Sequence, residues 1–163
     1  MRIRSIGVVG AGIMGAGIAA LAASIGIPVV LLDIPGSDDP KSPDRSGPAR
    51  KGLEKAIKAR PAAFLDTDRA ALVTTGNTAD HLDLLARCDW IVEAVVERLD
   101  IKQALYAKLE TLKRPGTAVS SNTSTIPLGH LVEGRSEQFK NDFLITHFFN
   151  PPRYMRLIEI VTS

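Results

Sequence analysis

A glycine pattern between a short apolar run and a run of small apolar residues constrains the fold of this chain more than any other feature. Residues 5–9 predict a buried strand, and Gly10, Gly12 and Gly15 follow it at the spacing G-x-G-x-x-G. The small residues after Gly15 indicate a helix that continues to Ile25. Strand, tight turn and helix in this order form the first part of a βαβ unit.

A second strand completes that unit and ends in an acid. Residues 28–34 are apolar and rich in β-branched side chains, and Asp33 stands near their end. A carboxylate at this position accepts hydrogen bonds from the ribose hydroxyls of a dinucleotide, and its charge repels a 2′-phosphate. The pattern therefore predicts NAD as the cofactor in preference to NADP.

The glycines have separate expected roles in that site. Gly10 permits the tight turn, Gly12 lets backbone amides approach the pyrophosphate, and Gly15 allows the helix to pack closely on the strand. The alternative is that the glycines serve only the turn and its packing. The other residues predicted to line the cofactor here are Ala11, Ile13 and Met14.

Apolar runs alternate with helix-forming segments along the rest of the chain. Further strands are expected at 71–75, 89–95, 117–121, 143–148 and 156–161, and helices at 49–60 and 99–112. The alternation predicts an α/β fold of Rossmann type, a doubly wound and mainly parallel sheet with helices on both faces. Pro151 and Pro152 separate the last two strands, which are expected to be neighbours and could pair antiparallel.

Composition indicates one globular domain over residues 1–163. The chain is 45% hydrophobic and 23% charged, with a formal charge of +2 and only 5% aromatic residues, so no nucleic-acid partner is expected. The single cysteine, Cys88, favours a reducing compartment, and no secretory signal or membrane span is recognised. A cytoplasmic location is the resulting expectation. No metal site is predicted.

One segment differs from the rest in composition. Residues 35–48 contain four prolines among polar residues and are predicted to form a flexible loop. The helix expected after it carries a basic face, made of Arg50, Lys51, Lys55, Lys58 and Arg60. This face is either a solvated surface or a contact for an anionic ligand.

The reacting groups are expected in the loops after the strands, because an open α/β sheet binds ligands beyond its carboxyl edge. Oxidation of an alcohol needs a base for the hydroxyl proton, and histidine changes its protonation near neutral pH. Of the three histidines, His147 stands near a strand end, whereas His81 lies in an expected loop and His130 in a short helix. His147 is therefore the candidate base, with a structural histidine as the alternative.

Several longer motifs point to a family. Residues 92–102 read VEAVVERLDIK, 121–124 read SNTS, 147–151 read HFFNP and 157–160 read LIEI. Together with the glycine pattern they resemble the NAD-binding domain of L-3-hydroxyacyl-CoA dehydrogenases over nearly the whole chain. The resemblance is greatest to the bacterial branch in which this domain opens a larger protein with dehydrogenase and enoyl-CoA hydratase activities.

The resemblance implies roles for individual residues in the NAD-dependent oxidation of L-3-hydroxyacyl-CoA to 3-ketoacyl-CoA, a step of fatty-acid β-oxidation. His147 would be the general base, and Glu159 would hold its imidazole and stabilise the imidazolium. Ser124 would form a hydrogen bond with the substrate hydroxyl or carbonyl and lie near the nicotinamide. Further NAD contacts implied by the family are Glu97, Lys102 and Asn150.

The chain departs from the family pattern in two ways. Residues 35–48 do not match the helical hairpin found beside CoA in many members, so no CoA contact is carried over from them. No helical substrate and dimerisation domain follows residue 163, so the chain is expected to be a fragment that binds NAD but turns over poorly. The expected partners are an acyl-CoA substrate and further copies, joined through the missing domains.

Other dehydrogenase classes fit less well. A short-chain dehydrogenase needs Tyr-x-x-x-Lys, but Glu110 follows Tyr106 and Ile158 follows Tyr154 at that spacing. A 3-hydroxyisobutyrate-type dehydrogenase shares the glycine turn without the histidine and glutamate motifs. A non-catalytic NAD-binding or structural protein on the same scaffold is the remaining alternative.

Overall fold

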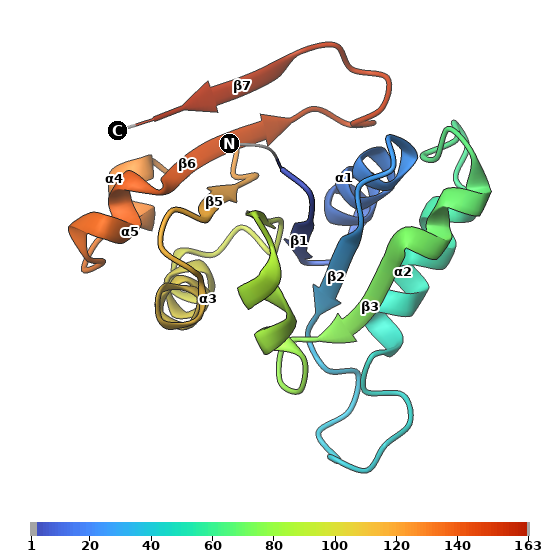
Figure 1. Ribbon diagram of the computed structural model, residues 1–163, viewed down its shortest axis with the longest axis horizontal. Helices are drawn as coiled ribbons and strands as arrows, with labels where there is room; N and C mark the ends of the chain where they lie inside the picture. Colours follow the sequence, from blue (N-terminus) through green and yellow to red (C-terminus); the bar gives the residue numbers. More distant parts are fainter. Residues whose placement is uncertain (1–2, 163) are drawn as a thin grey trace.

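The computed structural model describes residues 3–162 as a seven-stranded sheet with helices on both faces (Figure 1). The strands are β1 Ile6–Val9, β2 Val29–Asp33, β3 Val73–Asn77, β4 Trp90–Glu93, β5 Ala118–Ser121, β6 Phe143–Phe148 and β7 Ile158–Val161. The α-helices are α1 Ile13–Ser24, α2 Gly47–Lys58, α3 Leu99–Leu112, α4 Leu128–Leu131 and α5 Glu137–Asn141. Two 3₁₀ helices, η1 Thr67–Leu72 and η2 Leu82–Arg87, precede β3 and β4.

The strand order confirms the predicted doubly wound fold. The order is β3-β2-β1-β4-β5-β6-β7, and every neighbouring pair is parallel except β6 and β7, which are antiparallel. The chain winds outward from β1 in one direction and then returns to start again at β4. This reversal between β1 and β4 creates a crevice at the carboxyl edge of the sheet, where such folds bind ligands.

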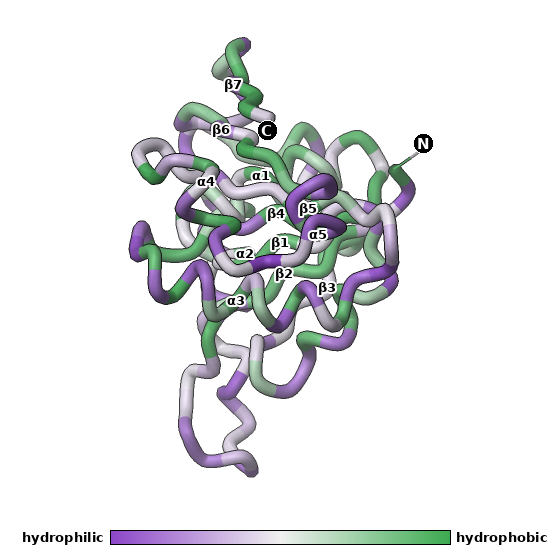
Figure 2. Tube along the Cα trace, turned by 90° about the vertical axis from the view of Figure 1, so that its left-hand side faces the viewer, coloured by the Kyte–Doolittle hydropathy of each residue, from purple (hydrophilic) through white to green (hydrophobic). Residues whose placement is uncertain are grey.

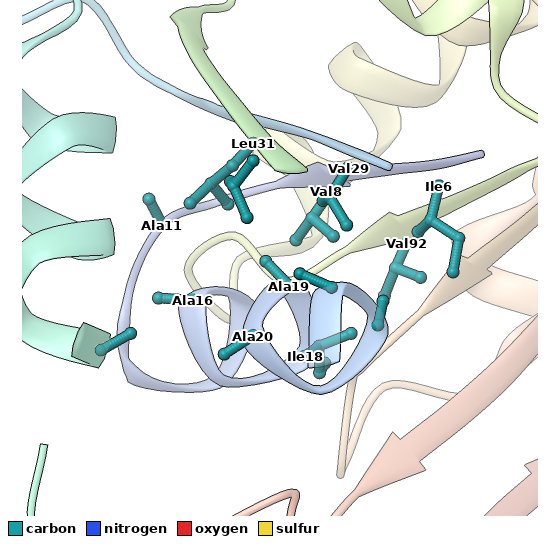
Figure 3. Close-up of a cluster of buried hydrophobic side chains, with 14 of the residues drawn as sticks. Ile6, Val8, Ala11, Ala16, Ile18, Ala19, Ala20, Val29, Leu31 and Val92 are labelled. Atoms are coloured by element: carbon teal, nitrogen blue, oxygen red, sulfur yellow. The ribbon is translucent and has the colours of Figure 1, made fainter. Parts of the chain in front are cut away.

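Alternate residues of the central strands supply two hydrophobic cores. Val8 and Leu31 are buried with α1 and α2 on one face, as Figure 3 shows for the side towards α1. Val9 and Leu32 are buried on the other face with α3, α4 and α5. Because neighbouring residues of a strand point to opposite faces, apolar runs without alternation are what a sheet covered on both sides requires. Figure 2 shows these strands as an apolar centre within a more polar outer layer.

Most element boundaries lie within a few residues of their predicted positions, with two corrections. The strand expected at 71–75 begins only at Val73, because η1 occupies the preceding residues and the Asp66 side chain caps it by accepting from the Asp68 amide. Helix α2 begins at Gly47, so the expected loop at 35–48 loses its last two residues to the helix. Pro48 suits the first turn, where its missing N–H is not needed.

The remainder of the 35–48 segment extends away from the sheet beyond β2 (Figures 1 and 2). It is attached at the end of β3 and just after it, where Arg45 makes an ion pair of 2.6 Å with Asp80 and the Ser46 hydroxyl accepts from the Asn77 side-chain amide at 3.2 Å. Within the segment, Arg45 also donates to the Ser37 carbonyl. Its flexibility stays a prediction. None of the helices among residues 3–162 has the length and apolar character needed to cross a membrane.

Candidate functional site

The turn between β1 and α1 needs glycine at two of its three marked positions. Gly10 has a φ of +101°, and a Cβ atom there would lie 2.4 Å from the Ala94 carbonyl oxygen. A Cβ atom at Gly15 would lie 1.7 Å from the Gly10 carbonyl oxygen, so α1 packs directly on the turn. At Gly12 a Cβ atom would meet nothing within 4 Å. The space beside Gly12 is therefore open to a ligand.

The amino end of α1 suits an anion. The helix has no acidic residue in its first turn and no side-chain cap, so its first amides are left for an external acceptor. Ile13, the first residue of the helix, is 78% exposed. Free amides and the helix dipole together favour a phosphate group at this position.

The Asp33 carboxylate lies against the same turn at the end of β2. Its Oδ2 accepts a hydrogen bond of 2.7 Å from the Ala11 amide, and its Oδ1 accepts one of 2.7 Å from the Ile34 amide. These bonds fix the carboxylate beside the glycine-rich turn. Each oxygen keeps a second lone pair, so ribose hydroxyls can still donate to it. The residues present therefore fit a dinucleotide.

A cavity of about 670 Å³ opens beside the turn, between α1, α2 and the segment after β6. Pro151 and Pro152 contribute to its apolar wall, and its basic lining residues are Lys51, Lys55, Arg60 and Arg153. Three of the five basic residues predicted on one helix face thus border a cavity. Arg50, a fourth, instead pairs with Asp44.

Helix α2 approaches the glycine-rich turn at a position that the sequence analysis did not identify. A Cβ atom at Gly52 would lie 2.2 Å from the Ala11 carbonyl oxygen, so only glycine allows the two backbones to meet. The available signal was an isolated glycine within a helical run. The close approach makes α2 a wall of the cavity.

His147 and Glu159 meet across the antiparallel pair at the edge of the sheet. The register of β6 and β7 sets the two residues opposite each other, and His147 Nδ1 lies 2.8 Å from Glu159 Oε2. The imidazole also contacts the Phe149 ring, with 4.7 Å between ring centroids. Because Nδ1 faces the carboxylate, Nε2 is the nitrogen that can exchange a proton with a ligand.

Glu97 organises the loop after β5 that carries Ser124. Its Oε1 accepts from the Thr123 hydroxyl, from the Ser124 amide at 3.2 Å and from the Thr125 amide at 3.4 Å. Partial burial acts to raise the pKa of Glu97, but the Thr123 hydroxyl and the Lys102 charge outweigh it and hold the pKa below its usual value. Glu97 is thus an ionised acceptor that holds the loop.

Lys102 occupies a different position from the one expected of a cofactor contact. Its side chain is only 1% exposed, and its ammonium lies 2.7 Å from Glu93 Oε1 and 3.2 Å from Glu97 Oε2. In this structure it touches the site through Glu97. Glu93 itself was missed by the sequence analysis, although a carboxylate at the end of an apolar strand was the signal.

The predicted site residues gather at one edge of the sheet. The glycine turn follows β1, Asp33 ends β2, Glu97 follows β4, and Ser124 follows β5. His147 is in β6, and the exposed Asn150 follows it on the border of the cavity. The Asn122 side chain accepts from the Phe148 amide at 2.9 Å and ties two of these loops together. Within residues 3–162 no hydrogen bond joins His147 to Ser124 directly.

Comparison with known proteins identifies the family to which this arrangement of residues is similar. Residues 5–163 match the family described as 3-hydroxyacyl-CoA dehydrogenase, NAD binding domain. The chain is 50% identical over 163 residues to a probable 3-hydroxyacyl-CoA dehydrogenase of Deinococcus radiodurans, covering 100% of this chain and 46% of that protein. It is 41% identical over 159 residues to a putative fatty acid oxidation complex trifunctional enzyme of Rickettsia felis, covering 98% of this chain and 22% of that protein.

A solved structure gives the same result. The 3-hydroxybutyryl-CoA dehydrogenase of Escherichia coli K12 resembles this chain with a TM-score of 0.77 and 30% identity, over 98% of this chain and 32% of that one. The chain therefore spans less than half the length of each of these three proteins.

Proposed function

The chain belongs to the family of 3-hydroxyacyl-CoA dehydrogenase NAD-binding domains, and from this we propose that it is the cofactor domain of an enzyme that oxidises L-3-hydroxyacyl-CoA to 3-ketoacyl-CoA in fatty-acid β-oxidation. The observation that carries the proposal is the 2.8 Å contact between His147 and Glu159 at the same edge of the sheet as the glycine-rich turn. A base and a dinucleotide cradle at one edge are what oxidation of an alcohol requires.

His147 is the proposed general base. Its Nε2 takes the proton of the 3-hydroxyl group, while Nδ1–H donates to Glu159 and keeps the ring in the required tautomer. The Glu159 carboxylate stabilises the imidazolium that results. NAD, when bound, supplies the acceptor for the hydride that leaves carbon 3. Ser124 donates to the substrate oxygen from the loop that Glu97 holds.

The proposed cofactor contacts follow the edge of the sheet. The pyrophosphate binds the amides of residues 10–15, and the adenosine ribose donates to Asp33. Asn150, Ser124 and Glu97 are the contacts proposed on the nicotinamide side. Lys102, buried behind Glu97, contributes through that carboxylate.

The cavity beside the turn has the charge that an acyl-CoA needs. CoA carries phosphate groups, and Lys51, Lys55 and Arg60 offer cations on an otherwise apolar lining. This favours the anionic-ligand interpretation of the basic helix face. Efficient turnover, we propose, also requires the additional residues present in the longer relatives, through which the protein would self-associate. The cytoplasmic location and the absence of a nucleic-acid partner stay predictions.

Turnover in a protein of the relatives' full length tests the activity. A 3-hydroxyacyl-CoA should reduce NAD, with NADH absorbance as the measurement and the substrate's D-isomer as the control. NADH binding without turnover of any 3-hydroxyacyl-CoA would favour the non-catalytic alternative instead.

Cofactor choice can be tested on the chain itself. NADH should bind more tightly than NADPH, because the Asp33 carboxylate repels a 2′-phosphate. Asp33→Ala should weaken NADH binding by about 1.5 to 3 kcal/mol, the contribution of hydrogen bonds to a charged group, and should narrow the preference. Fluorescence titration measures both. Equal affinity for the two nucleotides in the unaltered chain would refute the role of Asp33.

A further inference from the structure

A fully buried polar cluster lies beneath the loops that carry the proposed nicotinamide contacts. Glu93 is 0% exposed, and its Oε1 accepts from Lys102 Nζ at 2.7 Å and from the Val95 amide at 2.8 Å. Its Oε2 accepts from the Ser121 hydroxyl at 2.7 Å and from the Tyr106 hydroxyl at 2.5 Å. Both carboxylate oxygens are therefore fully occupied within the protein.

The cluster holds an ion pair and a tyrosine hydroxyl out of contact with water. Burial and the neighbouring Glu93 carboxylate hold the pKa of Tyr106 far above its usual value, so Tyr106 remains a donor. Lys102 and Glu93 are 1% and 0% exposed, and charges taken out of water cost more to bury than an apolar pair of the same size. Stability alone is therefore a weak reason for this arrangement, and a role in positioning neighbouring residues is the alternative.

Two contacts connect the cluster to the loop at residues 123–125: the Ser121 hydroxyl accepts from the Thr123 amide at 3.2 Å, and the Lys102 ammonium reaches Glu97. The same nitrogen that contacts Glu93 also lies 3.2 Å from Glu97 Oε2, and the Glu97 side chain is 38% exposed. The other oxygen of Glu97 accepts from Ser124 and Thr125. A single buried cation thus contacts one carboxylate inside the core and another at the rim of the site.

We propose that Lys102 is a positioning residue that Glu93 and Tyr106 hold in place and that acts through Glu97 to fix the loop at residues 123–125. Its consequence for catalysis, through Ser124, rests on the proposed function. The geometry supports the assignment because the ammonium cannot move towards solvent without leaving Glu93 unpaired. Glu97 is therefore presented to the loop in one orientation.

Amide hydrogen exchange of the cofactor-free chain tests the proposal without any activity. Lys102→Met removes the cation and keeps an unbranched side chain of similar length. Exchange at the Ser124 and Thr125 amides should become at least about tenfold faster relative to amides of β1 and β2, as expected for the loss of a hydrogen bond to a fixed charge. Unchanged relative exchange at these two amides would overturn the proposal.

Two further variants separate positioning from general stability. Tyr106→Phe removes only the hydroxyl and should produce a smaller increase at the same two amides, so it decides the question if Lys102→Met does not fold. Glu110→Gln is the control, because Glu110 lies on the same helix as Lys102 but pairs with Arg135, between α4 and α5, and not with the loop at residues 123–125. It should leave exchange at Ser124 and Thr125 in line with the rest of the domain. Equal acceleration throughout the domain in Lys102→Met or Tyr106→Phe would indicate a merely structural role.

NADH affinity supplies a second measurement. Lys102→Met and Glu97→Gln should each weaken NADH binding, and the double variant should be no weaker than the worse single variant, because both act in one chain of contacts. Multiplying losses would mean that Lys102 acts separately from Glu97. If the unaltered chain binds no NADH, the proposed function fails, whereas the exchange result on the loop still stands.

Discussion

The three glycines of the turn after β1 share a motif but differ in what surrounds them. A Cβ atom at Gly15 would lie 1.7 Å from a backbone oxygen, whereas a Cβ atom at Gly12 would meet no atom within 4 Å. Gly12 also has φ and ψ of −66° and −172°, which other residues adopt easily. Gly15 is therefore required by the fold, and Gly12 is free to serve a ligand.

This difference predicts opposite results from the same substitution. Gly12→Ala should leave the melting temperature nearly unchanged but weaken NADH binding, since the new methyl group occupies the space beside the helix amides. Gly15→Ala should destabilise the domain by about 3 kcal/mol or more, because backbone must move to admit the Cβ atom. Thermal unfolding with and without NADH measures both effects. Similar melting temperatures for the two variants would contradict the assignment.

Burial of single residues was harder to predict than their chemistry. The resemblance predicted Lys102 as a cofactor contact. A motif gives the identity of a lysine but not whether its side chain is exposed or buried. Its burial depends on Glu93 in β4, on Tyr106 one turn further along α3 and on Ser121 in β5. These residues come together only when the sheet and helix are assembled, so no local sequence pattern predicts the cluster.

Elements were predictable where a local pattern is strong. Helix α3 was expected at 99–112 and is observed at Leu99–Leu112, and the parallel strands follow the apolar runs. The start of β3 was wrong because η1 competes for the residues just before it. How the elements pack depends on tertiary contacts, which local patterns do not show. At Gly52, for example, α2 packs against the glycine-rich turn.

The attachment of the 35–48 segment leads to a prediction about pH. Hydrogen bonds from Arg45 and then from Asn77 lower the pKa of Asp80 from its ordinary 3.8 to about 2. Because this pKa is depressed, the stabilisation by the ion pair is complete above about pH 4 and is lost as the pH falls towards 2. Carboxyl carbon shifts measured by NMR should give a midpoint for Asp80 near 2.

Arg45→Met is the matching variant, because it removes the guanidinium and keeps an apolar stem. The Asp80 midpoint should then rise towards 3.8, remaining slightly lower because the Asn77 amide still donates to the carboxylate. Exchange of the amides between Ser37 and Arg45 should also become faster. A midpoint that does not move would show that the ion pair between Arg45 and Asp80 is absent in solution.

At the scale of the whole molecule, the parallel topology brings distant parts of the sequence to one edge. Asp33, Ser124 and His147 are separated by more than twenty residues along the chain, yet each lies at or near the carboxyl end of its own strand. This could be predicted, since every parallel strand ends on the same side. The contact between His147 and Glu159 needed one further feature, the reversal of direction between β6 and β7. Proline residues indicated a break there, but the register came from the assembled sheet.

The last prediction concerns how His147 and Glu159 act together, and it applies to a protein of the relatives' full length. His147→Gln should lower kcat by about 10²- to 10⁴-fold, the usual contribution of a general base, with little change in NADH binding. Glu159→Gln should lower kcat as well, because a neutral amide stabilises the imidazolium less than a carboxylate does. Steady-state kinetics with NADH production as the signal measures both.

The double variant distinguishes one functional unit from two independent groups. If Glu159 acts only through the 2.8 Å contact with His147, its carboxylate has nothing to stabilise once the imidazole is gone. The double variant should then be about as slow as His147→Gln alone, so the two losses would be far from additive in free energy. Losses that multiply would instead assign Glu159 a separate role in substrate or partner contact. Nearly normal turnover in His147→Gln would remove His147 from the mechanism.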